Sequence, residues 1–137
     1  MGEIRAQVKL TNAVDEALVR RGALRPDQVR RVEVEGVVDT GAVRSVLPIH
    51  IVQQLGLQIR GQRMAQYADG REESVGVTEP VIFECLTRDT MEEALVLGNE
   101  VLIGQTVLEK LDLLADCAGR RLIPHPDRPN QPVSMVR

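Results

Sequence analysis

Short apolar segments alternate with polar residues along most of the chain, as in proteins built from β-strands. Between residues 4 and 10 the apolar and polar side chains alternate one by one, which is the period of a half-buried strand. Short apolar runs recur later, at residues 32–38, 57–67, 75–77, 81–86, 94–97, 101–103, 113–115 and 122–123. Turn-forming residues separate these runs at intervals of about ten positions, which predicts an all-β barrel or sandwich.

Two segments depart from the strand period and predict short helices. Apolar residues recur at helical spacing over residues 48–55, where Pro48 suits a first turn and Gly56 suits a C-terminal cap. A second helix is expected over residues 106–111. The all-β fold should therefore carry one or two short helices.

One turn and the C-terminal segment have distinctive sequences. Asp69 and Gly70 separate two strand-like runs, and this pair favours a two-residue type I′ hairpin turn, whose central residues both have positive φ. Beyond residue 123 the chain is rich in proline, which predicts an extended and loosely attached tail. We therefore expect one domain over residues 1–124 and a proline-rich tail over residues 125–137.

The composition indicates an ordinary folded domain with an aliphatic core. Hydrophobic residues make up 43% of the chain and charged residues 27%, whereas Tyr67 and Phe83 are its only aromatic residues. The net charge of -3 and the lack of stacking aromatics argue against a nucleic-acid partner. We find no apolar signal segment and no long hydrophobic span, so we expect no membrane association and a cytoplasmic location. Cys85 and Cys117 are expected to be reduced thiols.

An acidic residue follows the apolar pair Val37 and Val38, in the stretch Gly36-Val-Val-Asp-Thr-Gly-Ala. Burying a charge is costly unless the group is compensated. Asp39 is therefore expected either to accept hydrogen bonds from the amides of a turn or to take part in chemistry. The tripeptide Asp-Thr-Gly does not by itself distinguish these alternatives.

The order of the motifs resembles that of the retropepsin-like aspartic proteases, also called clan AA, and in particular the short bacterial members. The resemblance covers residues 4–124 and rests on three parts of the chain. The first is the apolar pair followed by Asp39, Thr40, Gly41 and Ala42, the second is the hairpin at Tyr67, Ala68, Asp69 and Gly70, and the third is the triplet Leu102, Ile103 and Gly104 before a short helix. Together and in this order, these motifs are far more specific than any one of them.

This resemblance implies a small closed acid-protease β-barrel that forms one half of a two-fold dimer. Asp39 from each subunit would activate water for hydrolysis of a peptide bond, without a metal ion or cofactor. Thr40 would brace the two loops across the axis, Gly41 would allow close backbone approach, and Ala42 would pack beneath. Residues 67–70 would form the flap over the substrate, and residues 102–104 would support the site. The expected partners are a second copy of the chain and a peptide or protein substrate.

Other functional classes find less support in the sequence. Ser45, His50 and His125 lack the setting of a serine triad, and the cysteines and histidines lack zinc-ligand spacing. The acidic pair at residues 92–93 is expected to be solvated surface. Gln105 stands where an arginine commonly helps to tie the dimer together, which leaves the mode of dimerisation open. The main alternative is a non-catalytic dimeric β-barrel that binds a peptide or partner protein, and a monomeric precursor is a third.

Overall fold

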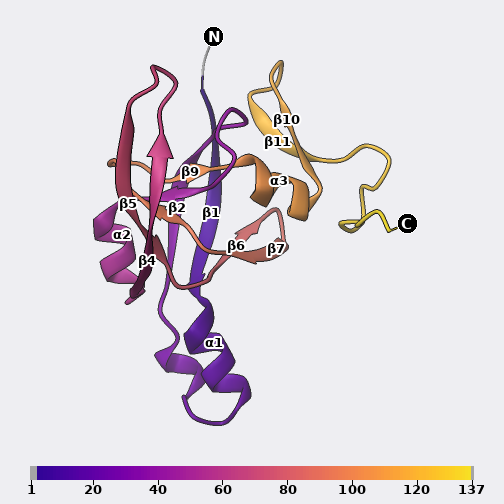
Figure 1. The fold of residues 1–137 in the computed structure, drawn as a ribbon. Coiled ribbons are helices and arrows are strands. Elements are labelled where there is room, and N and C mark those ends of the chain that lie inside the picture. The colour runs from indigo at the N-terminus through magenta and orange to yellow at the C-terminus, as the bar shows by residue number, and fades with distance from the viewer. Residues whose placement is uncertain (1–2, 137) are drawn as a thin grey trace.

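The computed structural model describes residues 3–136 and consists mostly of β-strands (Figure 1). Residues 1, 2 and 137, which terminate the expected domain and tail, lie outside the described residues. The strands are β1 (Ile4–Asn12), β2 (Arg31–Val38), β3 (Val46–Leu47), β4 (Ile59–Gln66), β5 (Glu72–Thr78), β6 (Val81–Cys85), β7 (Arg88–Glu92), β8 (Leu95–Val96), β9 (Leu102–Ile103), β10 (Leu113–Asp116) and β11 (Arg121–Pro124). The helices are α1 (Ala13–Arg20), the 3₁₀ turn η1 (Pro26–Gln28), α2 (Ile49–Gln54) and α3 (Gln105–Leu111).

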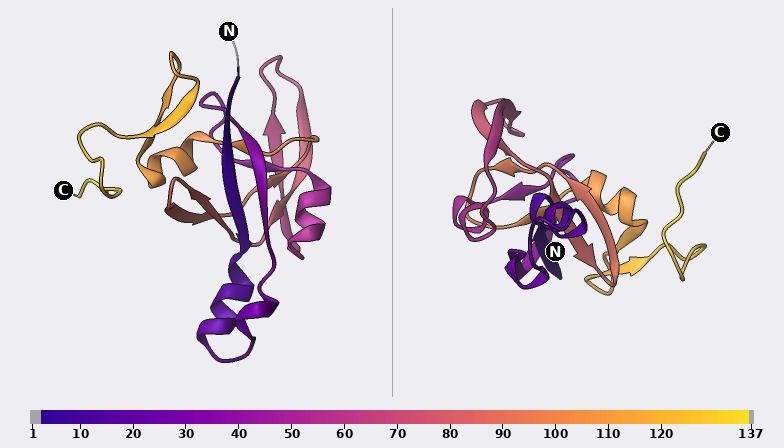
Figure 2. Two further views of the ribbon diagram at one scale, coloured as in Figure 1. Left: turned by 180° about the vertical axis from the view of Figure 1, so that it is seen from behind. Right: turned by 90° about the horizontal axis from the view of Figure 1, so that it is seen from below.

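Nine strands form one sheet in the order β4-β5-β8-β3-β9-β2-β1-β6-β7, and β10 and β11 form a separate pair. The large sheet is curled, and the β10–β11 pair lies to one side of it (Figure 2). The mostly β architecture confirms the coarse fold prediction. Within residues 3–136, β4 and β7 are the edges of this sheet and do not hydrogen-bond to each other, so the closed barrel of the prediction is not formed. β4 is an outer strand of which nearly every residue is exposed.

The core lies inside the curl of the sheet and is almost entirely aliphatic, as the composition predicts. Its one aromatic side chain is Phe83, which is fully buried among leucine, isoleucine and valine side chains from β1, α2 and α3. Burying these apolar side chains is the main stabilising contribution, because each fully buried one contributes roughly 1.5–3 kcal/mol. The helices α2 and α3 lie at the predicted places and close the core from two sides.

The helix α1 is absent from the prediction, because Thr11 and Asn12 look like residues that simply end a strand. Asn12 is instead the N-cap of this helix: its Oδ1 accepts the Asp15 N–H at 3.0 Å. The other end of the same amide anchors the helix to the body, since Nδ2 donates to the Leu55 carbonyl at 2.8 Å. Asp15 also binds the Arg30 guanidinium at 2.9 Å, which ties α1 to the strand that follows.

The hairpin β6–β7 is a second element that the sequence pattern does not reveal. Its two-residue loop consists of Leu86 and Thr87, both at positive φ (50° and 66°), which is the conformation of a type I′ turn. Neither residue favours positive φ, so the turn residues give no signal. The pairing of β6 with β7 therefore determines this turn.

The tail beyond β11 is held to the body, so the prediction of loose attachment is wrong. Asp112, which ends α3 in the left-handed region at φ 57°, has a nearly buried carboxylate. Arg128 donates two hydrogen bonds to this carboxylate, at 2.5 and 2.9 Å, and the Val133 N–H donates a third at 3.1 Å. Arg88 binds the Asp112 carbonyl at 2.9 Å and the Arg128 carbonyl at 2.8 Å, so strand, helix and tail share one anchor.

This anchor predicts a pH-dependent stability. The Arg128 hydrogen bonds, with a smaller contribution from the Val133 N–H, hold the pKa of Asp112 well below its usual range, despite the opposing effect of desolvation. A carboxyl group with a lowered pKa in the folded state stabilises the protein above its unfolded pKa of about 3.9, and this contribution is lost as the pH falls further. Asp112→Asn should therefore lower the melting temperature at pH 7, and its difference from the native chain should shrink below about pH 4.

Thermal unfolding monitored by circular dichroism between pH 2 and 7 measures this effect. The matched control is Asp89→Asn on β7, because Asp89 is exposed and makes no side-chain hydrogen bond within residues 3–136. A melting-temperature difference for Asp112→Asn that stays constant over the whole pH range would contradict the prediction.

None of the helices within residues 3–136 has the length and apolar character that crossing a membrane requires.

Candidate active site

The loop that carries Asp39 begins where two strands from distant parts of the chain lie side by side. β2 and β9 are parallel neighbours, with Val37 opposite Leu102 and Val38 opposite Ile103. The Asp39 N–H extends this ladder by donating to the Ile103 carbonyl at 2.9 Å. The structure thus brings the Asp-Thr-Gly motif against the predicted supporting triplet, although more than sixty residues separate them in the sequence.

Asp39 itself lies in a tight turn. Its Oδ1 accepts the Gly41 N–H at 3.1 Å, and its carbonyl accepts the Ala42 N–H at 3.2 Å. The Asp39 side chain remains half-buried, while Thr40 and Gly41 are exposed at the tip of the turn. The acid therefore braces its own turn and still reaches the surface.

The far side of this loop is anchored to the start of α3. The Gln105 N–H donates to the Ala42 carbonyl at 2.8 Å, and the Thr106 N–H donates to the Val43 carbonyl at 3.1 Å. The fully buried Ser45 hydroxyl accepts the Gly104 N–H at 2.8 Å. These contacts fix the loop at both ends, so that the position of Asp39 depends on α3 as well as on β2.

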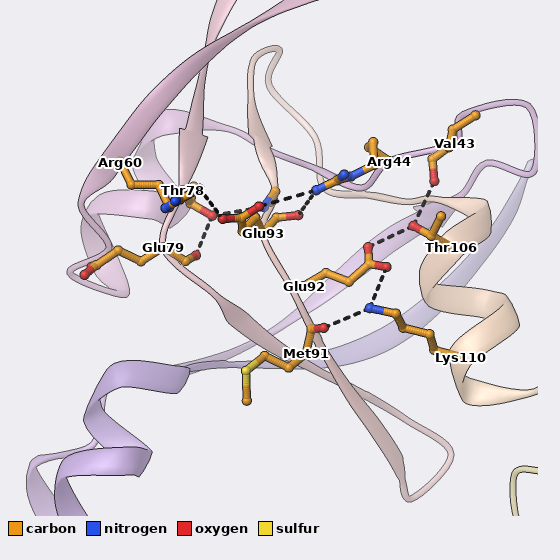
Figure 3. Close-up of polar contacts among 11 residues, drawn as sticks. Val43, Arg44, Arg60, Thr78, Glu79, Met91, Glu92, Glu93, Thr106 and Lys110 are labelled. Atoms are coloured by element: carbon orange, nitrogen blue, oxygen red, sulfur yellow. Dashed lines mark hydrogen bonds and ion pairs between the residues drawn. The ribbon is translucent and has the colours of Figure 1, made fainter. Parts of the chain in front are cut away.

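The Thr106 side chain, at the start of α3, takes part in further polar contacts with Glu92 of β7 (Figure 3). The Thr106 Oγ1 lies 3.0 Å from the Val43 carbonyl and 2.8 Å from Glu92 Oε1, and it can donate its one hydrogen to either. The Lys110 Nζ lies 3.1 Å from Glu92 Oε2. The Glu92 side chain is only 7% exposed, so the prediction that this acidic pair is solvated surface is wrong for Glu92.

Sequence reasoning missed these supporting residues. Thr106 and Ser45 are ordinary polar residues without a motif of their own, and Glu92 lies on a strand that was not predicted. On that strand the buried or half-buried residues Arg88, Thr90 and Glu92 are polar and the apolar Met91 is exposed, so the sequence shows no apolar alternation that could have revealed it.

Replacement of Thr106 by valine should measure how much the hydrogen bonds of the Thr106 hydroxyl contribute to the free energy of unfolding. The change preserves the shape of the side chain but removes the hydroxyl, which leaves Glu92 without one of its two partners. We expect a loss of about 1–2 kcal/mol in the free energy of unfolding, measured with urea. Thr106→Ser keeps the hydroxyl and should stay within about 0.5 kcal/mol of the native chain. Equal losses in the two variants would show that the hydroxyl contributes nothing.

The predicted flap residues lie at the tip of the β4–β5 hairpin, but their turn differs from the prediction. The Gly70 N–H donates to the Tyr67 carbonyl at 2.9 Å, and the Tyr67 N–H donates to the Arg71 carbonyl at 2.8 Å. Gly70 has positive φ (90°) and Asp69 does not, so the loop contains three residues, Ala68 to Gly70, and is not a type I′ turn. Gly70 supplies the positive φ that this longer loop requires.

The side chains of the hairpin tip bind mainly one another. The Tyr67 hydroxyl donates to Glu73 at 2.5 Å, which raises the pKa of Tyr67, and the Arg71 guanidinium lies 4.8 Å from the Tyr67 ring centre. The Arg71 N–H and guanidinium bind the Asp69 carboxylate, which lowers the pKa of Asp69. These contacts order the tip without any contribution from Asp39.

The hairpin tip and the Asp39 loop lie at the same end of the molecule. Val38 pairs with Ile4 at the start of β1, and the start of β1 and the tip of the β4–β5 hairpin are both at the top of Figure 1. A groove of about 530 Å³ lies along the hairpin, and Tyr67, Val75, Val96 and Leu97 are among the residues that line it. Asp39 is not part of its wall. Within the described chain, the structure therefore brings residues 102–104 to Asp39 but not the hairpin residues 67–70.

Within the described part of the chain, no cluster of three or more histidine, cysteine, aspartate or glutamate side chains is arranged to hold a metal ion.

The chain matches no protein-family model, and no curated protein sequence matches it.

Proposed function

We propose that this chain is an aspartic endopeptidase of the retropepsin-like type, active as a homodimer in which each subunit contributes Asp39. The observation that carries the proposal is the hydrogen-bonded junction of the Asp39 turn with Ile103, made across parallel strands. It joins the two most specific motifs of the sequence in one place. A loop that is fixed at both ends suits an acid whose position must be accurate.

Two carboxylates are needed for hydrolysis without a covalent intermediate. One accepts a proton from water, while the other donates a proton to the carbonyl oxygen of the substrate. Two unit charges about 3 Å apart at an effective dielectric constant of 20 repel by roughly 5 kcal/mol, which corresponds to about 4 pK units. Two Asp39 side chains at such a distance would therefore share one proton, and identical residues would act as acid and base.

The exposure of the turn is consistent with a site shared between two subunits. Thr40 and Gly41 are exposed at its tip, where a second copy of the loop can approach them. In such a dimer Thr40 would hydrogen-bond across the axis, and Ala42 would pack beneath the loop. The partner subunit would supply the second acid, because each chain has one Asp-Thr-Gly motif.

The hairpin tip is the proposed lid over the substrate, in keeping with its place at the same end of the sheet. Lids of this kind exclude water from the reaction and move when substrate enters. The substrate-binding surface should be largely apolar, because Val43, next to the turn, is 67% exposed and the groove along the hairpin is lined partly by aliphatic residues.

The alternative is a dimeric β-protein that binds a peptide or partner protein without cutting it. The hydrogen bond from the Gly41 N–H to Asp39 favours this alternative, because it gives the acid a purely structural use. Fold alone does not separate the two functions.

A peptide library incubated with the native chain between about pH 4 and 7, and analysed by mass spectrometry, tests the proposal. The expected result is cleavage of internal peptide bonds that yields products with new free termini. Peptides that are retained by the protein and recovered intact at every pH would support the binding alternative and contradict the protease.

A further inference from the structure

A pocket of about 310 Å³ lies next to the Asp39 loop, and most of its lining residues are charged. It is lined by Arg44 from that loop, Lys110 from α3, Glu92 and Glu93 from β7 and the segment after it, and the apolar Pro80 and Met91. All of these except Pro80 are labelled in Figure 3. Arg60 of β4 reaches the same cluster through Glu93. Two cationic side chains, Arg44 and Lys110, thus line the pocket with two carboxylates, and one of these, Glu93, is bound more closely by Arg60 from outside the lining.

The Arg44 guanidinium makes few hydrogen bonds for a charged group that is partly buried. Its Nη2 donates one long hydrogen bond, at 3.3 Å, to the Glu93 carbonyl. The Glu93 carboxylate is 3.9 Å from Arg44, because Arg60 binds it more closely at 2.5 Å. The Arg44 Nε is buried and has no hydrogen-bond partner within residues 3–136.

A buried donor without a partner is costly, by about 1–3 kcal/mol, and such groups in folded proteins call for an explanation. The Arg44 side chain is 30% exposed, and its one hydrogen bond to protein is weak. Turning the guanidinium toward a ligand would therefore break little and would give Nε a partner. Lys110 has a third donor to offer, since among residues 3–136 its ammonium group contacts only the Glu92 carboxylate and the Met91 carbonyl.

The position of the pocket relates it to the proposed cleft. Arg44 follows Asp39 by five positions in a loop that is anchored through Ala42 and Val43. Arg60 belongs to the first strand of the hairpin that would cover the substrate. The pocket therefore adjoins the Asp39 loop through Arg44, and its residue Glu93 contacts the start of the hairpin through Arg60, while it shares no lining residue with the groove along the hairpin.

We propose that Arg44, assisted by Lys110, binds a carboxylate group, so that the chain prefers peptides with an acidic side chain at one position near the bound segment. This inference rests on the proposed function for the identity of the ligand as a peptide. A guanidinium can bind a carboxylate through two parallel hydrogen bonds, which a neutral amide of the same shape cannot match. A free carboxylic acid offers the same chemistry and is treated as a separate ligand in the experiment.

Binding rather than cleavage is the primary readout. Fluorescein-labelled octapeptides with glutamate at one position, and their glutamine counterparts, are titrated into the Asp39→Asn chain and followed by anisotropy. The glutamate is placed at a different position in each peptide pair. For one of these positions, we expect the glutamate peptide to bind about tenfold more tightly than the glutamine peptide. Arg44→Gln should remove this preference. Arg21→Gln, which removes an exposed charge beyond the end of α1, should retain it.

Circular dichroism establishes that the Arg44→Gln chain is folded. If it is not, Lys110→Gln serves as the second variant and should reduce the preference by about threefold through loss of one charged donor. Disodium succinate distinguishes the two sources of the carboxylate. If millimolar succinate displaces the peptide from the chain with Arg44 but not from Arg44→Gln, a free acid is an alternative ligand of the site. If succinate does not displace the peptide, the site binds the carboxylate of a peptide.

The inference is overturned if no glutamate peptide is preferred, or if the preference survives in Arg44→Gln. A native chain that cuts nothing but shows Arg44-dependent binding would contradict the proposed function alone. A native chain that cuts glutamate and glutamine peptides equally well at every position would contradict the carboxylate site alone.

Discussion

Replacing Asp39 with asparagine should abolish peptide cleavage and lower kcat/KM by at least about 10³-fold, because both the general acid and the general base of the dimer are lost. Asparagine has nearly the same shape as aspartate, and its side-chain oxygen can still accept the Gly41 N–H. The turn should therefore remain folded while its ionisable group disappears. Cleavage of a fluorogenic peptide, with folding checked by circular dichroism, measures the effect. Undiminished cleavage by the Asp39→Asn chain would refute the proposed chemistry.

A mixture of the two chains tests whether each site needs two subunits. If subunits exchange freely and a working site requires Asp39 from both, equal amounts of native and Asp39→Asn chains should give about a quarter of the activity of the same total amount of native chain. Independent subunits would give half. Sedimentation of both chains under the assay conditions provides the control for equal dimer formation.

Gly104→Ala should be the most destabilising of the glycine substitutions near the site. A Cβ at this position would lie 2.6 Å from both the carbonyl carbon and the oxygen of Arg44, and 2.9 Å from the Ser45 nitrogen. These are backbone atoms of the Asp39 loop, which cannot move aside as a flexible side chain can. We expect a loss of about 3 kcal/mol in unfolding free energy and a fall in melting temperature of about 10 °C.

The matched control is Gly61→Ala on β4, where a Cβ would meet no atom within 4 Å. That variant should unfold within about 0.5 kcal/mol of the native chain. If Gly104→Ala proves as stable as Gly61→Ala, the close approach of α3 to the Asp39 loop does not exist in solution. Cleavage assays of Gly104→Ala at a temperature where it is folded should also show reduced activity, since the displaced backbone belongs to the loop of the acid.

The strands with regular alternation were predictable because each buries one face. β1 shows this best: Val8 and Leu10 are buried, and Gln7 before them is exposed. The helices α2 and α3 were predictable from apolar spacing and from Gly56, which has the positive φ expected after a helix. Local patterns of this kind depend only on neighbouring residues.

The missed elements depend on contacts between distant residues. The turn at Leu86 and Thr87 adopts positive φ because β6 and β7 pair, and neither residue has a conformational preference that predicts such a turn. Asn12 caps α1 while also binding Leu55, a contact that the sequence around Asn12 cannot reveal. Glu92 is buried because α3 supplies Lys110 and Thr106 to it.

The candidate site likewise contains some residues that could be predicted from local sequence and others that could not. The motif containing Asp39 and the triplet ending at Gly104 were recognisable as sequence, and the structure places them in contact. Thr106 and Arg44 were not recognisable, because their importance lies in distances to residues far along the chain.

The exposed outer strand β4 has a consequence for how the chain behaves during synthesis in a crowded cell. A strand at the edge of a sheet, with the hydrogen-bonding groups of its outer side facing water, is a template on which other chains can stack. Here burial does not prevent this stacking, and the charge of Arg63, which is exposed on this strand, opposes it by electrostatic repulsion. Arg63→Gln would leave the folded molecule nearly unchanged, yet would shift newly made chains from the soluble fraction to inclusion bodies.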